Sequence, residues 1–310
     1  MVPPGEEIEI IEPEHWRGPV LFNSPHSGRV YPREFLKTSR LDLPTLRRSE
    51  DSFVDDLARG VVERGYPLMR AHFPRCYVDV NREPYELDPR MFEGRLPSFA
   101  NTRSMRVAGG LGTVARVVGD AQEIYDQRIS VDDALRRIET LYKPYHRALR
   151  RLFTKVHREF GSAMLVDCHS MPSSTGPRDE RPRADVVLGD RYGTSCDPAI
   201  TDLVETVLAG RGYLVVRNKP YAGGFITEHY GNPASGLHAV QLGTHAVQFH
   251  DVARDAAGQR VGLQFGLDRD ASGDGVQAPG EAQDRGQFRH ASRGTRVADR
   301  GQLGLHVDGW

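Results

Sequence analysis

Short apolar runs alternate with longer amphipathic stretches along the first 242 residues. The apolar runs have the length and β-branched content of buried strands, and they lie at residues 19–22, 76–80, 163–167, 184–188, 213–217 and 237–242. Helical spacing of apolar residues marks 131–160, where Pro144 predicts a bend, and 198–210 is also predicted to be helical. A further helix is predicted to open at Ser49, as the N-cap ahead of acidic residues.

Strands interleaved with helices predict an α/β protein with a mostly parallel or mixed sheet covered on both faces. This pattern ends at Leu242. From Gly243 onward the sequence is rich in Gly, Arg and Gln and lacks Lys, Ile, Tyr, Met, Asn and Cys. Such a composition favours poor packing or disorder. We therefore expect two parts, a folded domain over 1–242 and an atypical tail over 243–310.

Composition and charge exclude several classes of protein. The chain has 310 residues with 41 Lys+Arg against 42 Asp+Glu, and its net charge of −1 excludes a strongly basic nucleic-acid binder. No apolar run approaches the ~20 residues that span a bilayer, and the N-terminal stretch lacks the pattern of a signal peptide. Three cysteines cannot build a disulfide scaffold. We expect a cytoplasmic enzyme that acts on a small molecule.

Two histidines follow predicted strands in turns of small and polar residues. His26 lies in Asn-Ser-Pro-His-Ser-Gly, and His169 lies in Val-Asp-Cys-His-Ser, where Asp167 could orient an imidazole. Glu50 and Asp51 add carboxylates about 25 residues after His26. Two histidines and one carboxylate form the usual ligand set of a catalytic zinc site, whose fourth position stays open for water.

Other polar groups offer alternatives or additions to this site. Cys168 beside a histidine could be a nucleophile, but adjacent strand residues point to opposite faces and no basic partner is evident. Asn81 and Arg82 follow a predicted strand, and an Arg binds a carboxylate through two hydrogen bonds. Glu228 lies in a glycine-rich segment and could act as an acid or base, although a flexible lid explains this segment equally well.

These motifs together resemble the N-formylglutamate amidohydrolase family. The chain carries in order FNSPHSGRVYP, RRSEDSFVDDLA, YVDVNREPYELDPRMFEGRLP, ANTRSMRVAGGLGT, YKPYHRALRRL, LVDCHSMPS, ADVVLGDRYGTSC and YAGGFITEHYGNPASGLHAVQL. They cover residues 20–242, about three quarters of the chain. Eight segments in the family's order are far more specific than any one motif.

The resemblance implies a zinc-carboxypeptidase-like fold of three layers, α/β/α. It also implies hydrolysis of N-formyl-L-glutamate to formate and L-glutamate, a step of histidine degradation. The metal residues of the family would fall on His26, Asp51 and His169, with Glu50 as the alternative to Asp51. The metal is expected to be Zn²⁺, with Co²⁺ or Mn²⁺ as alternatives.

Substrate recognition follows from the same resemblance. Asn81 and Arg82 would hold one substrate carboxylate, and Arg103 or Arg106 the second. A related hydrolase of another N-acyl acidic amino acid would carry the same motifs, so the acyl group stays open.

The sequence departs from the family after Leu242. There the family continues with a Glu, which the resemblance implies is the general base, whereas this chain has Gly243-Thr-His-Ala. A one-base shift of the reading frame can encode Glu-Leu-Thr-Arg at this point. We therefore hypothesise a frameshift at codon 243, which the coding DNA would test, and an impaired or non-catalytic product. Glu228 is then the remaining candidate for the base.

Overall fold

The computed structural model describes residues 7–171 and 184–245, all of which belong to one compact unit. Most of the predicted tail lies outside the described residues. Within the described ranges, every helix is too short or too polar to cross a bilayer.

A seven-stranded mixed sheet forms the centre of the described chain, in the order β1-β3-β2-β8-β11-β9-β10. Its strands are β1 Ile8–Ile11, β2 Val20–Ser24, β3 Leu68–Ala71, β8 Ala163–Met171, β9 Val186–Gly189, β10 Val215–Arg217 and β11 Leu237–His245. Strands β3, β2, β8 and β11 run parallel to one another, whereas β1 pairs antiparallel with β3 and β9 pairs antiparallel with β11; β10 runs parallel to β9. Two small ribbons pair β4 Phe92–Glu93 with β7 Ile129–Ser130 and β5 Val117–Val118 with β6 Gln122–Glu123.

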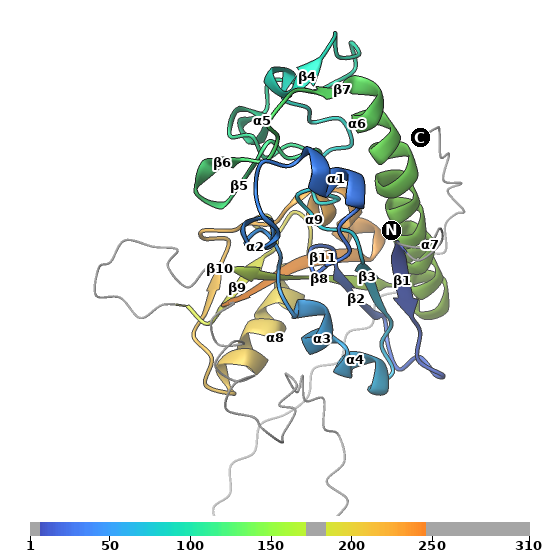
Figure 1. Ribbon diagram of the computed structural model, residues 1–310. Coiled ribbons are helices and arrows are strands. Elements are labelled where there is room, and N and C mark those ends of the chain that lie inside the picture. The colour runs from blue at the N-terminus through green and yellow to red at the C-terminus, as the bar shows by residue number, and fades with distance from the viewer. Residues whose placement is uncertain (1–6, 172–183, 246–310) are drawn as a thin grey trace, which may run out of the picture. The chain divides into compact units, whose positions relative to one another are not determined.

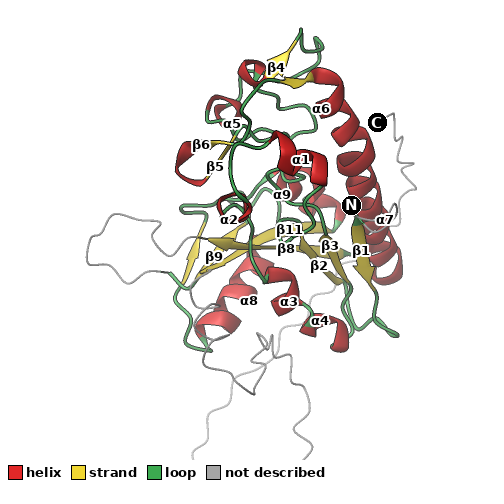
Figure 2. Cartoon of the chain, viewed as in Figure 1, coloured by secondary structure: helices red, strands yellow, loops and turns green. Residues whose placement is uncertain are grey.

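Helices cover both faces of this sheet (Figures 1 and 2). On one face lie α1 Arg33–Thr38, α7 Lys143–Phe160 and α9 Phe225–Tyr230, and on the other α3 Val54–Ala58, α4 Gly60–Glu63 and α8 Pro198–Ala209. The remaining helices are α2 Leu43–Arg47, α5 Met105–Ala108, α6 Val131–Arg137, the π-helix η3 Ile138–Tyr142 and the 3₁₀ turns η1 Pro89–Met91, η2 Gly119–Ala121 and η4 Pro233–Ser235. The predicted three-layer α/β/α architecture with a mixed sheet is confirmed.

Two apolar cores hold the layers together. The larger one joins Leu21, Leu165 and Ala239 of the sheet to Tyr145 and Leu149 of α7. The smaller one lies on the opposite face, between the sheet and the helices α3, α4 and α8. Because side chains alternate along a strand, β2, β8 and β11 supply both cores and read as continuous apolar runs.

Three predictions about elements were wrong. Residues 76–80 form no strand, because the N–H groups of Tyr77 and Val78 donate to the carbonyl of Pro74 in a turn. Ser49 caps no helix; its hydroxyl donates to the carbonyl of Leu46 at the end of α2. Strand β11 continues three residues past its predicted end at Leu242.

Candidate metal centre

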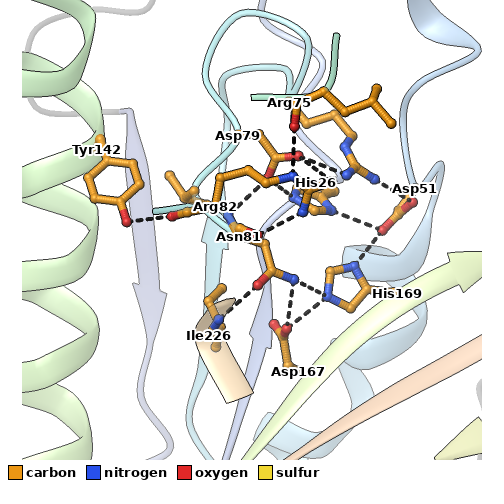
Figure 3. Close-up of polar contacts among 12 residues, drawn as sticks. His26, Asp51, Arg75, Asp79, Asn81, Arg82, Tyr142, Asp167, His169 and Ile226 are labelled. Atoms are coloured by element: carbon orange, nitrogen blue, oxygen red, sulfur yellow. Dashed lines mark hydrogen bonds and ion pairs between the residues drawn. The ribbon is translucent and has the colours of Figure 1, made fainter. Parts of the chain in front are cut away.

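Three buried side chains converge at the carboxyl ends of β2 and β8 (Figure 3). His26 lies in the loop after β2, Asp51 in the loop before α3, and His169 near the end of β8. One ligand atom from each residue lies within 4.8 Å of the others. The structure therefore brings together the three residues that the sequence indicated as metal ligands.

Local backbone contacts place His26 and Asp51 side by side. The Asp51 N–H donates to the His26 carbonyl at 3.0 Å, and the Ser27 hydroxyl donates to the Asp51 carbonyl at 3.1 Å. Gly28 lets this loop pass against the chain after β3, because a Cβ at this position would lie 2.0 Å from the Phe73 carbonyl oxygen.

Each histidine has a second buried carboxylate behind it. Nε2 of His26 donates to Asp79 Oδ1 at 2.8 Å, and Nε2 of His169 donates to Asp167 Oδ2 at 2.8 Å. The Nδ1 atoms then face Asp51, whose Oδ2 lies 2.8 Å from His169 Nδ1 and 3.4 Å from His26 Nδ1. Both imidazoles are thus oriented as metal-bound histidines usually are, with one nitrogen held by a carboxylate.

The residues present fit a divalent metal ion. Two imidazole nitrogens and one carboxylate oxygen are ligands that Zn²⁺ prefers. His26 Nδ1 is buried and has no hydrogen-bond partner among the described residues. A buried polar atom without a partner is costly, and coordination of a metal would satisfy it.

The electrostatics of the centre are dominated by these close pairs. Burial alone would lower the pKa of His169, but the carboxylates of Asp167 and Asp51 raise it to about 10. Burial would raise the pKa of Asp51, yet its contacts with His169 and His26 lower it below its ordinary value. Asp51 therefore stays ionised beside both histidines.

Asp51 is favoured over Glu50 as the ligand. The Glu50 side chain is buried elsewhere, where its Oε1 accepts from the Tyr31 hydroxyl at 2.9 Å and from Arg47 Nε at 3.2 Å. The Cys168 alternative also fails on geometry. Its side chain joins the smaller core on the face opposite His169, and burial raises the pKa of its thiol.

Asn81 and Arg82 lie beside the triad, but Asn81 is engaged within the protein. Its Oδ1 accepts from the Ile226 N–H at 2.8 Å, and its Nδ2 donates to Asp167 Oδ2 at 3.3 Å. Arg82 Nη2 lies 3.5 Å from Asp79 Oδ2, and Arg82 Nη1 donates to the Asn81 carbonyl.

The other candidate residues lie apart from the triad. Arg103 is exposed, and its backbone N–H donates to Asn101 Oδ1. Burial lowers the pKa of Arg82; the Asp79 carboxylate opposes this, and the charges of Arg75 and Arg106 add to it, so Arg106 lies within electrostatic range of Arg82. Glu228 on α9 is 56% exposed in its side chain and pairs with Arg191 at 3.1 Å.

Sequence reasoning missed Arg75 and the role of Asp79. Arg75 Nη2 donates to Asp79 Oδ2 at 2.8 Å, and its Nη1 lies 3.9 Å from Asp51 Oδ1. Asp79 stood in a recognised motif, two residues before Asn81, and could have been noticed there. Arg75 gave no signal, because only the turn after Pro74 brings it to the site.

Gly243 lies on the strand next to His169. In the parallel pair of β11 and β8, Gly243 is in register with His169, so a side chain at 243 would share its face. A Cβ there would meet only ordinary contacts, the nearest being Val187 O at 3.8 Å. A Cβ therefore fits where this chain has glycine.

Known proteins match this chain over the same region that carries the motifs. A model of the family described as N-formylglutamate amidohydrolase matches residues 18–246. An N-formylglutamate deformylase of Pseudomonas aeruginosa is 31% identical over 238 residues, which cover 76% of this chain and 83% of that protein. A deformylase of Pseudomonas putida is 28% identical over 73% of this chain and 79% of that protein. The solved N-formylglutamate amidohydrolase of Ralstonia eutropha JMP134 superposes with a TM-score of 0.72 and 36% identity, covering 77% of this chain and 86% of that one.

Proposed function

Because this chain belongs to the N-formylglutamate amidohydrolase family, we propose that it hydrolyses N-formyl-L-glutamate to formate and L-glutamate. One observation carries the proposal. The buried triad of two carboxylate-backed histidines and an aspartate lies within the region that matches the family. Such a triad suits metal-assisted hydrolysis, and Cys168, the nucleophile that the sequence offered beside it, packs in the core on the opposite face.

His26, Asp51 and His169 would hold the metal, which we propose to be Zn²⁺, with Co²⁺ or Mn²⁺ as substitutes. When bound, the ion supplies a Lewis acid that polarises the formyl carbonyl and makes water nucleophilic near neutral pH. Asp79 and Asp167 would hold each imidazole by its Nε2–H and keep Nδ1 directed at the ion.

Substrate carboxylates would be recognised by the arginines near the triad. Arg82 is the first candidate, since it is close to the triad through Asp79, and Arg75 adds a second positive charge there. For the other carboxylate, Arg106 is a better candidate than Arg103, because Arg106 lies within electrostatic range of Arg82. Asn81 would act on the substrate only indirectly, because both ends of its amide are occupied.

Gly243 favours a second candidate function, that of an impaired copy of the enzyme. Asp51, Asp79 and Asp167, the carboxylates around the two histidines, are all engaged with them. The family's Glu would occupy position 243, on the face of His169. We propose that the sequence from Gly243 onward replaces the original end of a catalytic domain that spans 1–242.

We also propose that the reaction takes place in the cytoplasm. The support is that all three cysteines are free and buried, as is usual in reducing compartments.

The test measures formate released from N-formyl-L-glutamate by the purified 310-residue chain with added Zn²⁺. N-acetyl- and N-succinyl-L-glutamate, assayed for released glutamate, test the choice of acyl group. Release of formate by the wild-type chain or its Gly243→Glu variant supports the proposal. If neither variant cleaves any of the three substrates while binding Zn²⁺, the proposed reaction is wrong.

A further inference from the structure

Two backbone carbonyls of the segment Val80–Arg82 accept hydrogen bonds from the continuous helix formed by η3 and α7. The Tyr142 hydroxyl donates to the Arg82 carbonyl at 2.7 Å, as Figure 3 shows. One helical turn later, His146 Nε2 donates to the Val80 carbonyl at 2.9 Å. These two hydrogen bonds lie on either side of Asn81, so its backbone is held from both directions.

A break in helical regularity keeps both donors on the same side of the helix as the buried residues that precede them. The buried residues Ala134, Ile138, Tyr142 and His146 follow one another at intervals of four. In a regular α-helix three such intervals drift by about 120°, since each residue turns the chain by about 100°. The π-helix η3 takes up about one extra residue just before Pro144, which lacks an N–H, and so cancels most of this drift.

The side chain of Asn81 connects this backbone segment to the metal centre. Its Nδ2 lies 3.2 Å from His169 Nε2 and 3.3 Å from Asp167 Oδ2, while its Oδ1 accepts from Ile226 at the start of α9. Helix α9 can approach this closely only because residue 224 is glycine, where a Cβ would lie 2.4 Å from Asn81 Oδ1. Asn81 therefore connects α7 and α9 to the carboxylate that orients His169.

We infer that Tyr142 and His146 are positioning residues that hold Asn81 against Asp167 and thereby pre-organise His169 for metal binding. Neither side chain contacts the triad, so their effect passes through the backbone of Val80 and Arg82. The inference rests on the proposed metal site. It adds that hydrogen bonds from Tyr142 and His146 hold the ligand His169 in place through Asn81 and Asp167. Partners behind a metal ligand commonly change metal affinity by about 10–100-fold, and a more remote pair should have a smaller effect.

The test measures zinc affinity of the folded full-length chain by competition with a fluorescent chelator, with no substrate present. Tyr142→Phe should weaken Zn²⁺ binding about fivefold, through its lost hydrogen bond to the Arg82 carbonyl. His146→Leu should weaken it about tenfold, because it loses the hydrogen bond to the Val80 carbonyl and also the one between Nδ1 and the Tyr230 hydroxyl. His146→Gln, whose amide can still donate to the Val80 carbonyl, should restore affinity to within about twofold of the wild type.

Tyr125→Phe is the matched control, because it also removes a buried tyrosine hydroxyl that forms a hydrogen bond, here accepted from Arg137 Nη1. It should lower the unfolding temperature and leave zinc affinity unchanged. If Tyr142→Phe and His146→Leu lower the unfolding temperature but bind Zn²⁺ as the wild type does, their role is structural only and the inference is wrong. If the wild-type chain binds no Zn²⁺, the metal site and this inference fall together, whereas loss of formate release alone would leave the inference standing.

Discussion

Replacing Gly243 by Glu should increase turnover of N-formyl-L-glutamate. Position 243 is in register with His169 on the adjacent strand, about 4.8 Å away between backbones, and its side chain would share the face of His169. The nearest atoms to a Cβ at this position lie at 3.8 to 4.0 Å, so the Cβ fits without moving its neighbours. Gly in a strand also carries an entropic cost, so the substitution should not destabilise the fold.

The size of the effect follows from the role of a general base. Such a group usually contributes about 10²–10⁴-fold to the rate, which is about 2.7–5.4 kcal/mol of activation free energy. We therefore expect the kcat of Gly243→Glu to exceed that of the wild type by at least about 100-fold. KM should change little, because the new carboxylate would act on water rather than on the substrate.

The assay is formate release at saturating Zn²⁺, with two control variants. Gly243→Gln has the size of Glu but cannot accept a proton, and Thr244→Glu places a carboxylate one residue on, facing the other side of the sheet. Neither control should gain more than about twofold. Equal rates for Gly243→Glu, Gly243→Gln and the wild type, in folded proteins that bind Zn²⁺, would refute the role assigned to position 243.

Three further predictions concern the metal, the remaining candidate base and pH. Zn²⁺ at about 100 times its Kd should stabilise the wild type by about 2.7 kcal/mol in thermal unfolding, and Asp51→Asn should lose most of that shift; an undiminished shift would exclude Asp51 as a ligand. Glu228→Gln should change kcat less than twofold, since its side chain is exposed and paired with Arg191; a 100-fold loss would make Glu228 the base. Burial, opposed by the hydrogen bond to Val80 and reinforced by the charges of His229 and Arg150, lowers the pKa of His146 from 6.5 to about 3. The unfolded chain therefore takes up the extra proton between these values. Stability should fall below pH 6.5 by up to about 1.4 kcal/mol per pH unit, and urea unfolding at pH 7 and pH 5 should show a smaller fall for His146→Gln.

The sequence by itself determined the layered α/β architecture and the identity of the metal candidates. The strands at 163–167 and 237–242 and the helix at 131–160 were predictable, because burial imposes a period on apolar residues. His26, Asp51 and His169 were predictable because few residue types bind metals, and because their motifs occur in the order of a known family. Even the absence of a carboxylate at Gly243 was visible as a departure from that order.

Only the tertiary structure decided how the other side chains are used. Periodicity reports which residues are buried but not which groups their backbones bind, so the sequence predicts a strand at 76–80 where the structure has a turn. Asn81 was expected to face substrate, yet it bonds to Ile226, 145 residues away, and to Asp167. Arg75 reaches Asp79 and Asp51 only through that turn. Such contacts join residues that are distant in the chain, and they exist only once packing has fixed the layers.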